Sequence, residues 1–364
     1  MLFGAAALGA CASMNAGEVR RPIVIAHRGA SGERPEHTMG AYRLAIAQGA
    51  DFIEPDLVLT RDGVLVCRHE NEISGTTDVA THAAFAARRT TKTIDGQSVS
   101  GWFVEDFTLE ELRTLRCKER LPELRPRNME WDGEEEIPVF TDVLALAMAS
   151  GVGIYPELKH PGFLAAQGLD PVGALIGAFA RGGGQAAVDR AFVQCFEIGP
   201  LITLASMSSI RWNCIQLIAA EGGPADRPSL TYADMVSDAG LAEIAVYARG
   251  IGVEKRLIIP RGADETSLPP TDLVARAHAA RLLVHAWTFR AENYFLPSEL
   301  RRSDPLARTF MRLHGDLAEE LRRFYAQGVD GVFCDFPAMA VCCGPGVSTA
   351  LHRFPDARSV VRNP

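Results

Sequence analysis

Short apolar segments recur along the chain and alternate with segments in which apolar residues return every three or four positions. The first pattern is typical of buried strands and the second of amphipathic helices. We expect strands near residues 23–27, 52–58, 64–69, 152–158, 191–196, 213–218, 251–254, 282–288 and 331–335. We expect helices within residues 38–48, 141–150, 172–181, 241–249, 271–280 and 315–327.

The repeated strand–helix units predict an α/β protein in which helical crossovers join parallel strands. The signatures GxGxxG and GxxxxGK[ST], which mark nucleotide-binding open sheets, do not occur in the sequence. We therefore expect a closed (β/α)8 barrel, a TIM barrel, over residues 21–343. A chain of 364 residues can form such a barrel as one domain.

One segment, at residues 70–136, breaks the repetition. It follows the hairpin expected after the second strand, is rich in Thr, Arg and Pro, and contains no clear strand–helix unit. Long excursions from the end of a barrel strand usually serve a binding or catalytic site. We expect an insertion that contributes to the site, and the alternative is a decorative surface loop.

The net charge of the chain is -8, and no block of Lys and Arg is interleaved with aromatic residues. Nucleic-acid binding therefore gains no support. No apolar run reaches 18 residues, so no transmembrane span is indicated. A small anionic substrate would have to be met by a local cluster of cations, because the overall field is negative.

Residues 1–20 are similar to part of a secretion signal, because an apolar stretch is followed by small residues. Leu8-Gly9-Ala10-Cys11 resembles a bacterial lipobox, although no Lys or Arg precedes it. We expect an exported protein, either periplasmic or anchored to a membrane through a lipid on Cys11. The alternative is an ordinary disordered segment, and residues 344–364 are expected to form a second tail.

Two carboxylates stand on the second expected strand. Alternation in Phe52-Ile53-Glu54-Pro55-Asp56 places Glu54 and Asp56 on the same face. Two buried carboxylates are costly unless a cation pairs with them. Oxygen ligands favour a hard divalent ion, Ca²⁺ or Mg²⁺. The alternative is a salt-bridged face that points to solvent.

The Asp-Gly pair at residues 62–63 lies between two apolar runs and predicts a hairpin. A turn centred near residues 61–62 sets Glu54 opposite His69 and Asp56 opposite Cys67. We therefore expect His69 to lie beside the two carboxylates and Cys67 to pack against the same site. A register shift of one residue would reverse these faces.

Other strand ends carry chemistry as well. Glu157 and Lys159 alternate onto one face, where the carboxylate would complete a metal site and the lysine would meet an anion; a surface ion pair is the alternative. Trp287 ends a core strand and could pack a small glycerol-like group, although an aromatic there can also be plain core. Phe196 ends another strand in a similar way, and His285 is expected to be a core histidine.

The carboxyl ends of barrel strands meet at one mouth, where active sites lie. His27 and Arg28 end the first strand, so they would join the carboxylates, His69 and Lys159 there. Such a set suits the cleavage of a phosphate ester. A metal and the cations would neutralise charge on the phosphoryl group. One histidine would act as general base and the other as general acid.

Six stretches in this order resemble the bacterial periplasmic glycerophosphodiester phosphodiesterases: AHRGASGERPEHT, FIEPDLVLTRDG, RHENEISGTTDVA, GIYPELKHP, VHAWTFR and DGVFCDFP. The resemblance runs from Pro22 to Ala340. It implies a TIM barrel with an insertion. It also implies hydrolysis of deacylated phospholipids to sn-glycerol 3-phosphate and an alcohol, with a divalent cation that is typically Ca²⁺.

The resemblance also implies roles for individual residues: an acid–base pair (His27, His69), metal ligands (Glu54, Asp56, Glu157), phosphate-binding cations (Arg28, Lys159) and glycerol-packing aromatics (Phe196, Trp287). Two positions depart from the family, because His37 stands where Asn is common and Glu70 where Asp follows the histidine. Neither change removes a proposed catalytic group. Direct attack by water and attack by a glycerol hydroxyl, through a cyclic glycerol phosphate, both stay open.

Three other functions are alternatives for this sequence. A phospholipase D-like enzyme on the same barrel would act on intact lipid, but it would need an apolar mouth, and the sequence shows no contiguous apolar loop. A surface-anchored binding protein on the barrel would be favoured by the loss of a ligand or a histidine, yet every candidate is present. A structural lipoprotein would leave the carboxylates and strand-end histidines unexplained.

Overall fold

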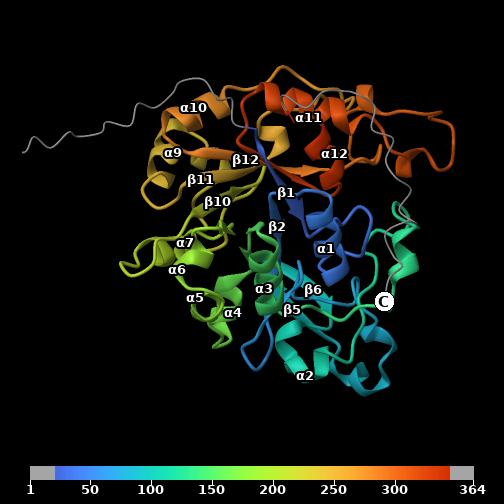
Figure 1. The fold of residues 1–364 in the computed structure, drawn as a ribbon, viewed down its shortest axis with the longest axis vertical. Coiled ribbons are helices and arrows are strands. Elements are labelled where there is room, and N and C mark those ends of the chain that lie inside the picture. Colours follow the sequence, from blue (N-terminus) through green and yellow to red (C-terminus); the bar gives the residue numbers. More distant parts are fainter. Residues whose placement is uncertain (1–20, 345–364) are drawn as a thin grey trace, which may run out of the picture.

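A computed structural model describes residues 21–344 of the chain (Figure 1). The predictions for residues 1–20, including the lipobox and Cys11, lie outside the described residues. The same holds for nearly all of the tail predicted at residues 344–364. The described residues contain no helix that is both long and apolar enough to cross a membrane.

The centre of the molecule is an 11-stranded curled sheet. Its parallel strands are β1 (Ile23–His27), β2 (Phe52–Glu54), β3 (Asp56–Leu59), β7 (Gly153–Ile154), β8 (Glu157–Leu158), β9 (Val193–Cys195), β10 (Cys214–Ile218), β11 (Gly250–Glu254), β12 (Leu283–Phe289) and β13 (Gly331–Cys334). β1 pairs with β2, β2 with β7, and β3 with β8; parallel pairing then runs from β8 to β13 and returns from β13 to β1. The α/β class and the TIM-barrel type of fold are as predicted.

Two prolines divide two of the expected strands. Pro55 separates β2 from β3, and Pro156 lies between β7 and β8. Proline has no N–H to donate to a ladder, so each strand is interrupted without being lost. The pairing resumes at once, because the N–H of Glu157 donates to the carbonyl of Pro55 at 2.9 Å. The strands therefore bring Asp56 and Glu157 into register as direct partners.

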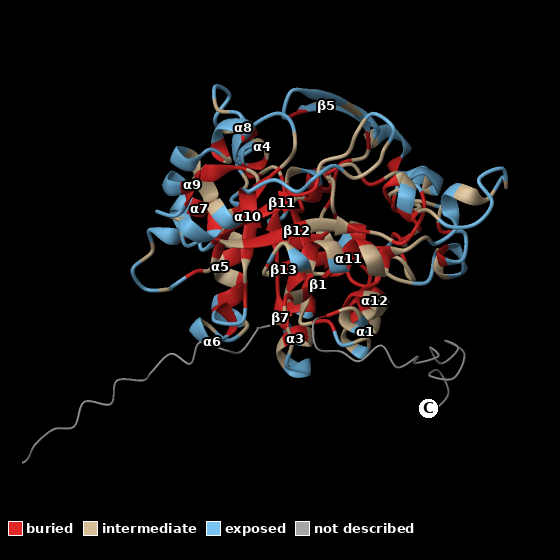
Figure 2. Ribbon diagram, turned by 90° about the horizontal axis from the view of Figure 1, so that it is seen from above, coloured by how far each residue is buried: buried red, intermediate tan, exposed pale blue. Residues whose placement is uncertain are grey.

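Helices cover the outside of the sheet, as the red centre and pale-blue periphery of Figure 2 show. They are α1 (Met39–Ala47), α3 (Phe140–Ser150), α4 (Pro161–Ala166), α5 (Pro171–Arg181), α6 (Gln185–Val188), α7 (Ile198–Ala205), α8 (Tyr232–Met235), α9 (Asp238–Ile244), α10 (Leu273–Ala279), α11 (Leu317–Ala326) and α12 (Pro337–Cys342). The expected helix at 241–249 starts earlier and ends at Ile244. Its start is fixed by Ser237, whose hydroxyl accepts the N–H of Gly240.

The segment between β4 (Leu65–Cys67) and α3 has a small core of its own. It contains a hairpin of β5 (Thr90–Ile94) and β6 (Gln97–Gly101), short 3₁₀ turns and α2 (Leu109–Leu112). In Figure 2, β5 stands at the end of the barrel opposite α3 and α6. The hairpin strands are mostly exposed and polar, so no apolar pattern announced them.

The register predicted for the hairpin of β3 and β4 is wrong by one residue. Leu57 pairs with Cys67, so Asp56 does not face Cys67. The turn is centred on Asp62, because the N–H of Thr60 donates to the carbonyl of Val64 at 3.0 Å. Cys67 consequently packs in the main hydrophobic core instead of lining the site.

Candidate active site

The carboxyl ends of the strands open into a cavity of about 540 Å³. Eight of the predicted site residues line it: His27, Arg28, Glu54, His69, Glu157, Lys159, Phe196 and Trp287. The ninth, Asp56, is not on the wall but lies buried between its neighbours. The structure thus brings the whole predicted set together.

Three carboxylates form the floor of this site. Glu54, Asp56 and Glu157 are all buried, and each places one oxygen within 4.8 Å of the others. Asp56 Oδ1 and Glu157 Oε1 are buried, and the group beside both of them is the ammonium of Lys159. Three clustered carboxylates against one lysine leave negative charge that a hard divalent cation, with its preference for oxygen ligands, would neutralise. The three side chains therefore fit a Ca²⁺ or Mg²⁺ ion.

The pKa values of two of these carboxyls also favour a bound cation. Burial and the charge of Asp56 raise the pKa of Glu54 well above its usual value. Burial likewise raises the pKa of Glu157 to about 8, with Asp56 adding to the effect and Lys159 opposing it. Both shifts favour the protonated form of the carboxyl while no cation is bound. A bound divalent ion would displace those protons, so binding is coupled to pH.

The pKa of Asp56 moves the other way. Burial acts to raise it, but the charge of Lys159, together with the hydrogen bond from His37 and the charge of Arg28, holds the pKa well below the usual range. Lys159 Nζ lies 3.3 Å from Asp56 Oδ1 and 2.6 Å from Glu157 Oε1. Lys159 therefore contacts two of the three carboxylates. It also lines the cavity, where it can contact an anionic substrate.

Arg28 is fixed from several sides. Its backbone N–H donates to Glu54 Oε2 at 2.8 Å. Its guanidinium lies 3.3 Å from Asp56 Oδ2 and 2.9 Å from Glu36 Oε2. The residue adopts φ 60°, a strained conformation for a side chain other than glycine. Gly29 follows because a Cβ there would come within 2.7 Å of the Ala41 backbone. The tight turn aims the Arg28 N–H at the carboxylate.

His27 is oriented by Asp335, whose role the sequence analysis missed. His27 Nδ1 lies 2.7 Å from Asp335 Oδ1, and Asp335 is held in turn by Arg125 and Arg290. Burial and Arg28 lower the pKa of His27 to about 4 against the opposing effect of Asp335. The ring is neutral at pH 7, and with Nδ1–H on the carboxylate, Nε2 is free to accept a proton.

His69 has an equivalent partner. Its Nδ1 lies 2.5 Å from Glu70 Oε1, so the glutamate that departs from the family pattern still orients the ring. Burial, Arg28 and Lys159 lower the pKa of His69 to about 3. His69 lies beyond the end of β4, so its approach to the carboxylates does not depend on the mistaken register.

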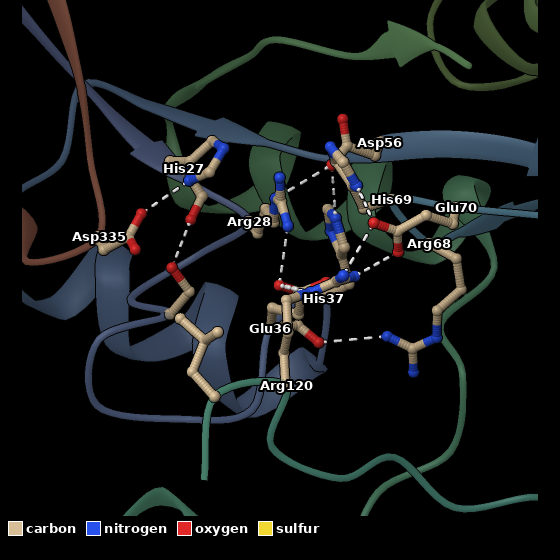
Figure 3. Close-up of polar contacts among 12 residues, drawn as sticks. His27, Arg28, Glu36, His37, Asp56, Arg68, His69, Glu70, Arg120 and Asp335 are labelled. Carbon is tan, nitrogen blue, oxygen red and sulfur yellow. Dashed lines mark hydrogen bonds and ion pairs between the residues drawn. The ribbon is translucent and has the colours of Figure 1, made fainter. Parts of the chain in front are cut away.

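Arg120 ties the two halves of the site together (Figure 3). Its guanidinium donates to both oxygens of Glu36, which holds Arg28, and to both oxygens of Glu70, which holds His69. Arg120 belongs to the segment between β4 and α3. Its neighbours in the sequence, Lys118 and Glu119, form no motif with it, so no local pattern indicated its role.

The second departure from the family pattern, His37, keeps a structural role. His37 Nε2 lies 2.9 Å from Asp56 Oδ2, and Nδ1 lies 2.7 Å from the Tyr42 hydroxyl. An imidazole N–H can supply the hydrogen bond that an asparagine amide would give. Asp56 is therefore oriented by a buried neighbour as well as by the cations.

Aromatic residues close one side of the cavity. The rings of Phe196 and Trp287 meet edge to face, with centroids 5.9 Å apart, and Trp287 Nε1 donates to the Gly252 carbonyl at 2.9 Å. They present an apolar wall of fixed orientation. His285 is buried, and its Nδ1 lies 2.7 Å from the Tyr155 hydroxyl. It is a core histidine, as predicted.

Comparisons with known proteins agree with this site. The model of the glycerophosphoryl diester phosphodiesterase family matches residues 27–339. A glycerophosphodiester phosphodiesterase of Arabidopsis thaliana is 36% identical over 356 residues, covering 94% of this chain and 88% of that protein. One from Haemophilus influenzae is 29% identical over 349 residues, covering 88% of each.

Two solved structures have a similar fold. A putative glycerophosphoryl diester phosphodiesterase from Silicibacter pomeroyi aligns with a TM-score of 0.63 at 20% identity, covering 90% of this chain and 94% of the other. A phosphodiesterase of Oleispira antarctica, in complex with the product sn-glycerol-3-phosphate, gives 0.58 at 20% identity, covering 89% and 96%. With the family match over most of the chain, this protein belongs to the glycerophosphodiester phosphodiesterase family.

Proposed function

We propose that this enzyme hydrolyses glycerophosphodiesters to sn-glycerol 3-phosphate and an alcohol. The observation that carries the proposal is a buried carboxylate triad beside two cations and two carboxylate-oriented histidines. The names of the relatives and the product bound in the Oleispira antarctica structure support the substrate class. The family to which the chain belongs supports the same reaction, and each group of site residues has a role in it.

Glu54, Asp56 and Glu157 would hold a divalent ion, and we propose Ca²⁺, with Mg²⁺ as the alternative. All-oxygen ligands suit both ions, and Ca²⁺ tolerates the irregular geometry of an all-protein site better. When bound, such an ion neutralises negative charge that gathers on the phosphoryl group. Two of the carboxylates otherwise favour the protonated form, which supports a site built for a cation.

The remaining residues would bind and transfer protons. Arg28 and Lys159 would hold the phosphate oxygens, and Phe196 and Trp287 would pack the glycerol carbons. His27 and His69 would serve as the acid–base pair. One neutral ring takes a proton on Nε2 from the attacking hydroxyl. The other ring, protonated on Nε2 once the negative phosphate lies beside it, gives that proton to the departing alcohol. Direct attack by water and a cyclic route both need this pair of transfers.

We also propose that the protein is exported, either as a periplasmic protein or as one anchored to a membrane through a lipid on Cys11. The support is the likeness of residues 8–11 to a lipobox after an apolar stretch. Deacylated phospholipids would reach such a protein from outside the cytoplasm.

A second candidate is hydrolysis of intact lipid. Tyr294 and Met311 line the cavity and are 58% and 44% exposed, and Leu306 in the same β12–α11 connection is 90% exposed. This connection supplies apolar side chains at the mouth that the sequence pattern did not reveal. At equal concentration, faster release of choline from a phosphatidylcholine than from its deacylated form would favour this candidate.

The first prediction concerns the reaction. The purified protein should release sn-glycerol 3-phosphate from glycerophosphocholine when Ca²⁺ or Mg²⁺ is present, as measured with a coupled dehydrogenase assay. Chelator should abolish the release, because the triad would be left without its cation, and added Ca²⁺ should restore it. A folded sample that releases no product with either metal would refute the proposal.

The second prediction concerns the histidines. The substitutions His27→Ala and His69→Ala should each lower kcat by about 10²–10⁴, because each removes one proton transfer. His278, an exposed histidine on α10, offers a matched control, and His278→Ala should keep kcat unchanged. Thermal denaturation should verify that all three variants fold. Near-normal turnover in either site variant would remove that residue from the mechanism.

The third prediction concerns Arg120. Arg120→Ala should lower kcat about 10- to 100-fold, because Glu36 and Glu70 lose the group that orients them. Added guanidinium should recover part of the activity, a rescue that a merely destabilised protein would not show. The control is Arg113→Ala, an exposed arginine of the same segment. Unchanged kcat in Arg120→Ala would contradict a positioning role.

A further inference from the structure

The cavity extends beyond the proposed metal and phosphate positions, along a wall formed by β11, β12 and the segments that follow them. Its charged residues there are Lys255, Arg256, Arg261, Arg290 and Arg301, against the carboxylates Glu254 and Glu265. We call these five cations the cationic wall. The chain as a whole carries a net charge of -8, so the sign of the charge is reversed inside the cavity.

Neighbouring carboxylates cancel only part of this charge, because they are shared. Glu320 Oε1 lies 2.7 Å from Lys255 Nζ and 3.2 Å from an Arg261 nitrogen. Glu265 Oε2 lies 3.4 Å from Arg256 and 3.2 Å from Arg261. Two carboxylates are thus shared among three cations. With Glu254 included, three carboxylates stand against the five cations of the wall, so net positive charge faces the cavity.

Two arginines have still less compensation. Asp335 Oδ2 contacts Arg290 and Arg125 while its other oxygen contacts His27. Arg301 Nε donates to the Leu296 carbonyl, and within residues 21–344 its guanidinium makes no ion pair with a carboxylate. Guanidinium groups with free N–H donors are suited to phosphate oxygens, which they bind with two hydrogen bonds.

The Phe295 ring of this wall is not open to a cationic alcohol. The guanidinium of Arg290 lies 4.6 Å from the centroid of the Phe295 ring and already occupies that face. A quaternary ammonium group would need open aromatic faces, and it would be repelled by the five neighbouring cations. An anionic group would meet attraction at the same place.

The wall begins beside the reacting centre, because Arg290 and His27 contact the same carboxylate, Asp335. The cavity volume of about 540 Å³ is in the range of sites for drug-sized ligands, whereas glycerol phosphate is much smaller. We propose that the cationic wall binds the alcohol part of the substrate and selects alcohols that carry a further phosphate group. This inference rests on the proposed function and specifies its substrate class.

The test compares initial rates on three substrates with Ca²⁺ present. They are glycerophosphocholine, glycerophosphoglycerol and fully deacylated cardiolipin, whose alcohols are cationic, neutral and anionic. A fourth, glycerophosphoinositol 4-phosphate, distinguishes a phosphomonoester from a phosphodiester as the recognised anion. The kcat/KM for at least one anionic substrate should exceed that for glycerophosphocholine by about tenfold or more, because charged hydrogen bonds contribute on this scale. The preference should shrink at high salt.

Paired variants locate the effect. The double substitution Arg256→Gln and Arg301→Gln should lower the ratio of kcat/KM between the anionic and choline substrates by about tenfold. The control is Arg181→Gln with Arg211→Gln, which changes the net charge equally at exposed positions that precede β9 and β10. The control should keep the wild-type ratio.

The outcomes separate the two proposals. Release from all substrates with equal kcat/KM would overturn the inference and leave the proposed function standing. A preference that survives in the Arg256/Arg301 variant would overturn the role of the cationic wall. No release from any substrate would overturn the proposed function, and the inference with it.

Discussion

The mutual repulsion of Glu54, Asp56 and Glu157 is the constraint on which the rest of the site depends. One oxygen of each lies within 4.8 Å of the others in a buried part of the barrel. Each uncompensated buried charge there costs on the order of several kcal/mol of folding free energy. That cost is a large fraction of the total stability of a typical domain. Lys159 and Arg28 offset part of this cost, and protons or a divalent ion must supply the rest. This electrostatic repulsion favours binding of a cation at the carboxylates, and Lys159 and Arg28 favour an anion beside it.

The same repulsion explains why so many ion pairs surround the triad. Arg28 is held by Glu36, Glu36 and Glu70 are held by Arg120, and Asp335 is held by Arg125. Buried pairs of this kind add little net stability, but they fix geometry. They connect β1, the end of β4 and the segment between β4 and α3. That segment therefore contributes Arg120 to the network of ion pairs around the site.

The sequence predicted the barrel and most of the site because both follow from short-range patterns. The alternation of side chains along a strand predicted that Glu54 and Asp56 share one face. The positions at which apolar strands end predicted His27 and Lys159 as site residues. The hairpin register failed because it depended on where a turn is centred, which a difference of one residue decides. Arg120 could not be found, since its partners lie 50 and 84 positions away and no local pattern records such contacts.

The most direct test of this account is a crystal structure obtained with Ca²⁺ and sn-glycerol 3-phosphate, with anomalous data to locate the ion. The account predicts one ion at about 2.3–2.6 Å from oxygens of Glu54, Asp56 and Glu157. It also predicts a phosphate within hydrogen-bond reach of Arg28 and Lys159. An ion bound away from the three carboxylates, or a phosphate that does not reach these cations, would contradict it.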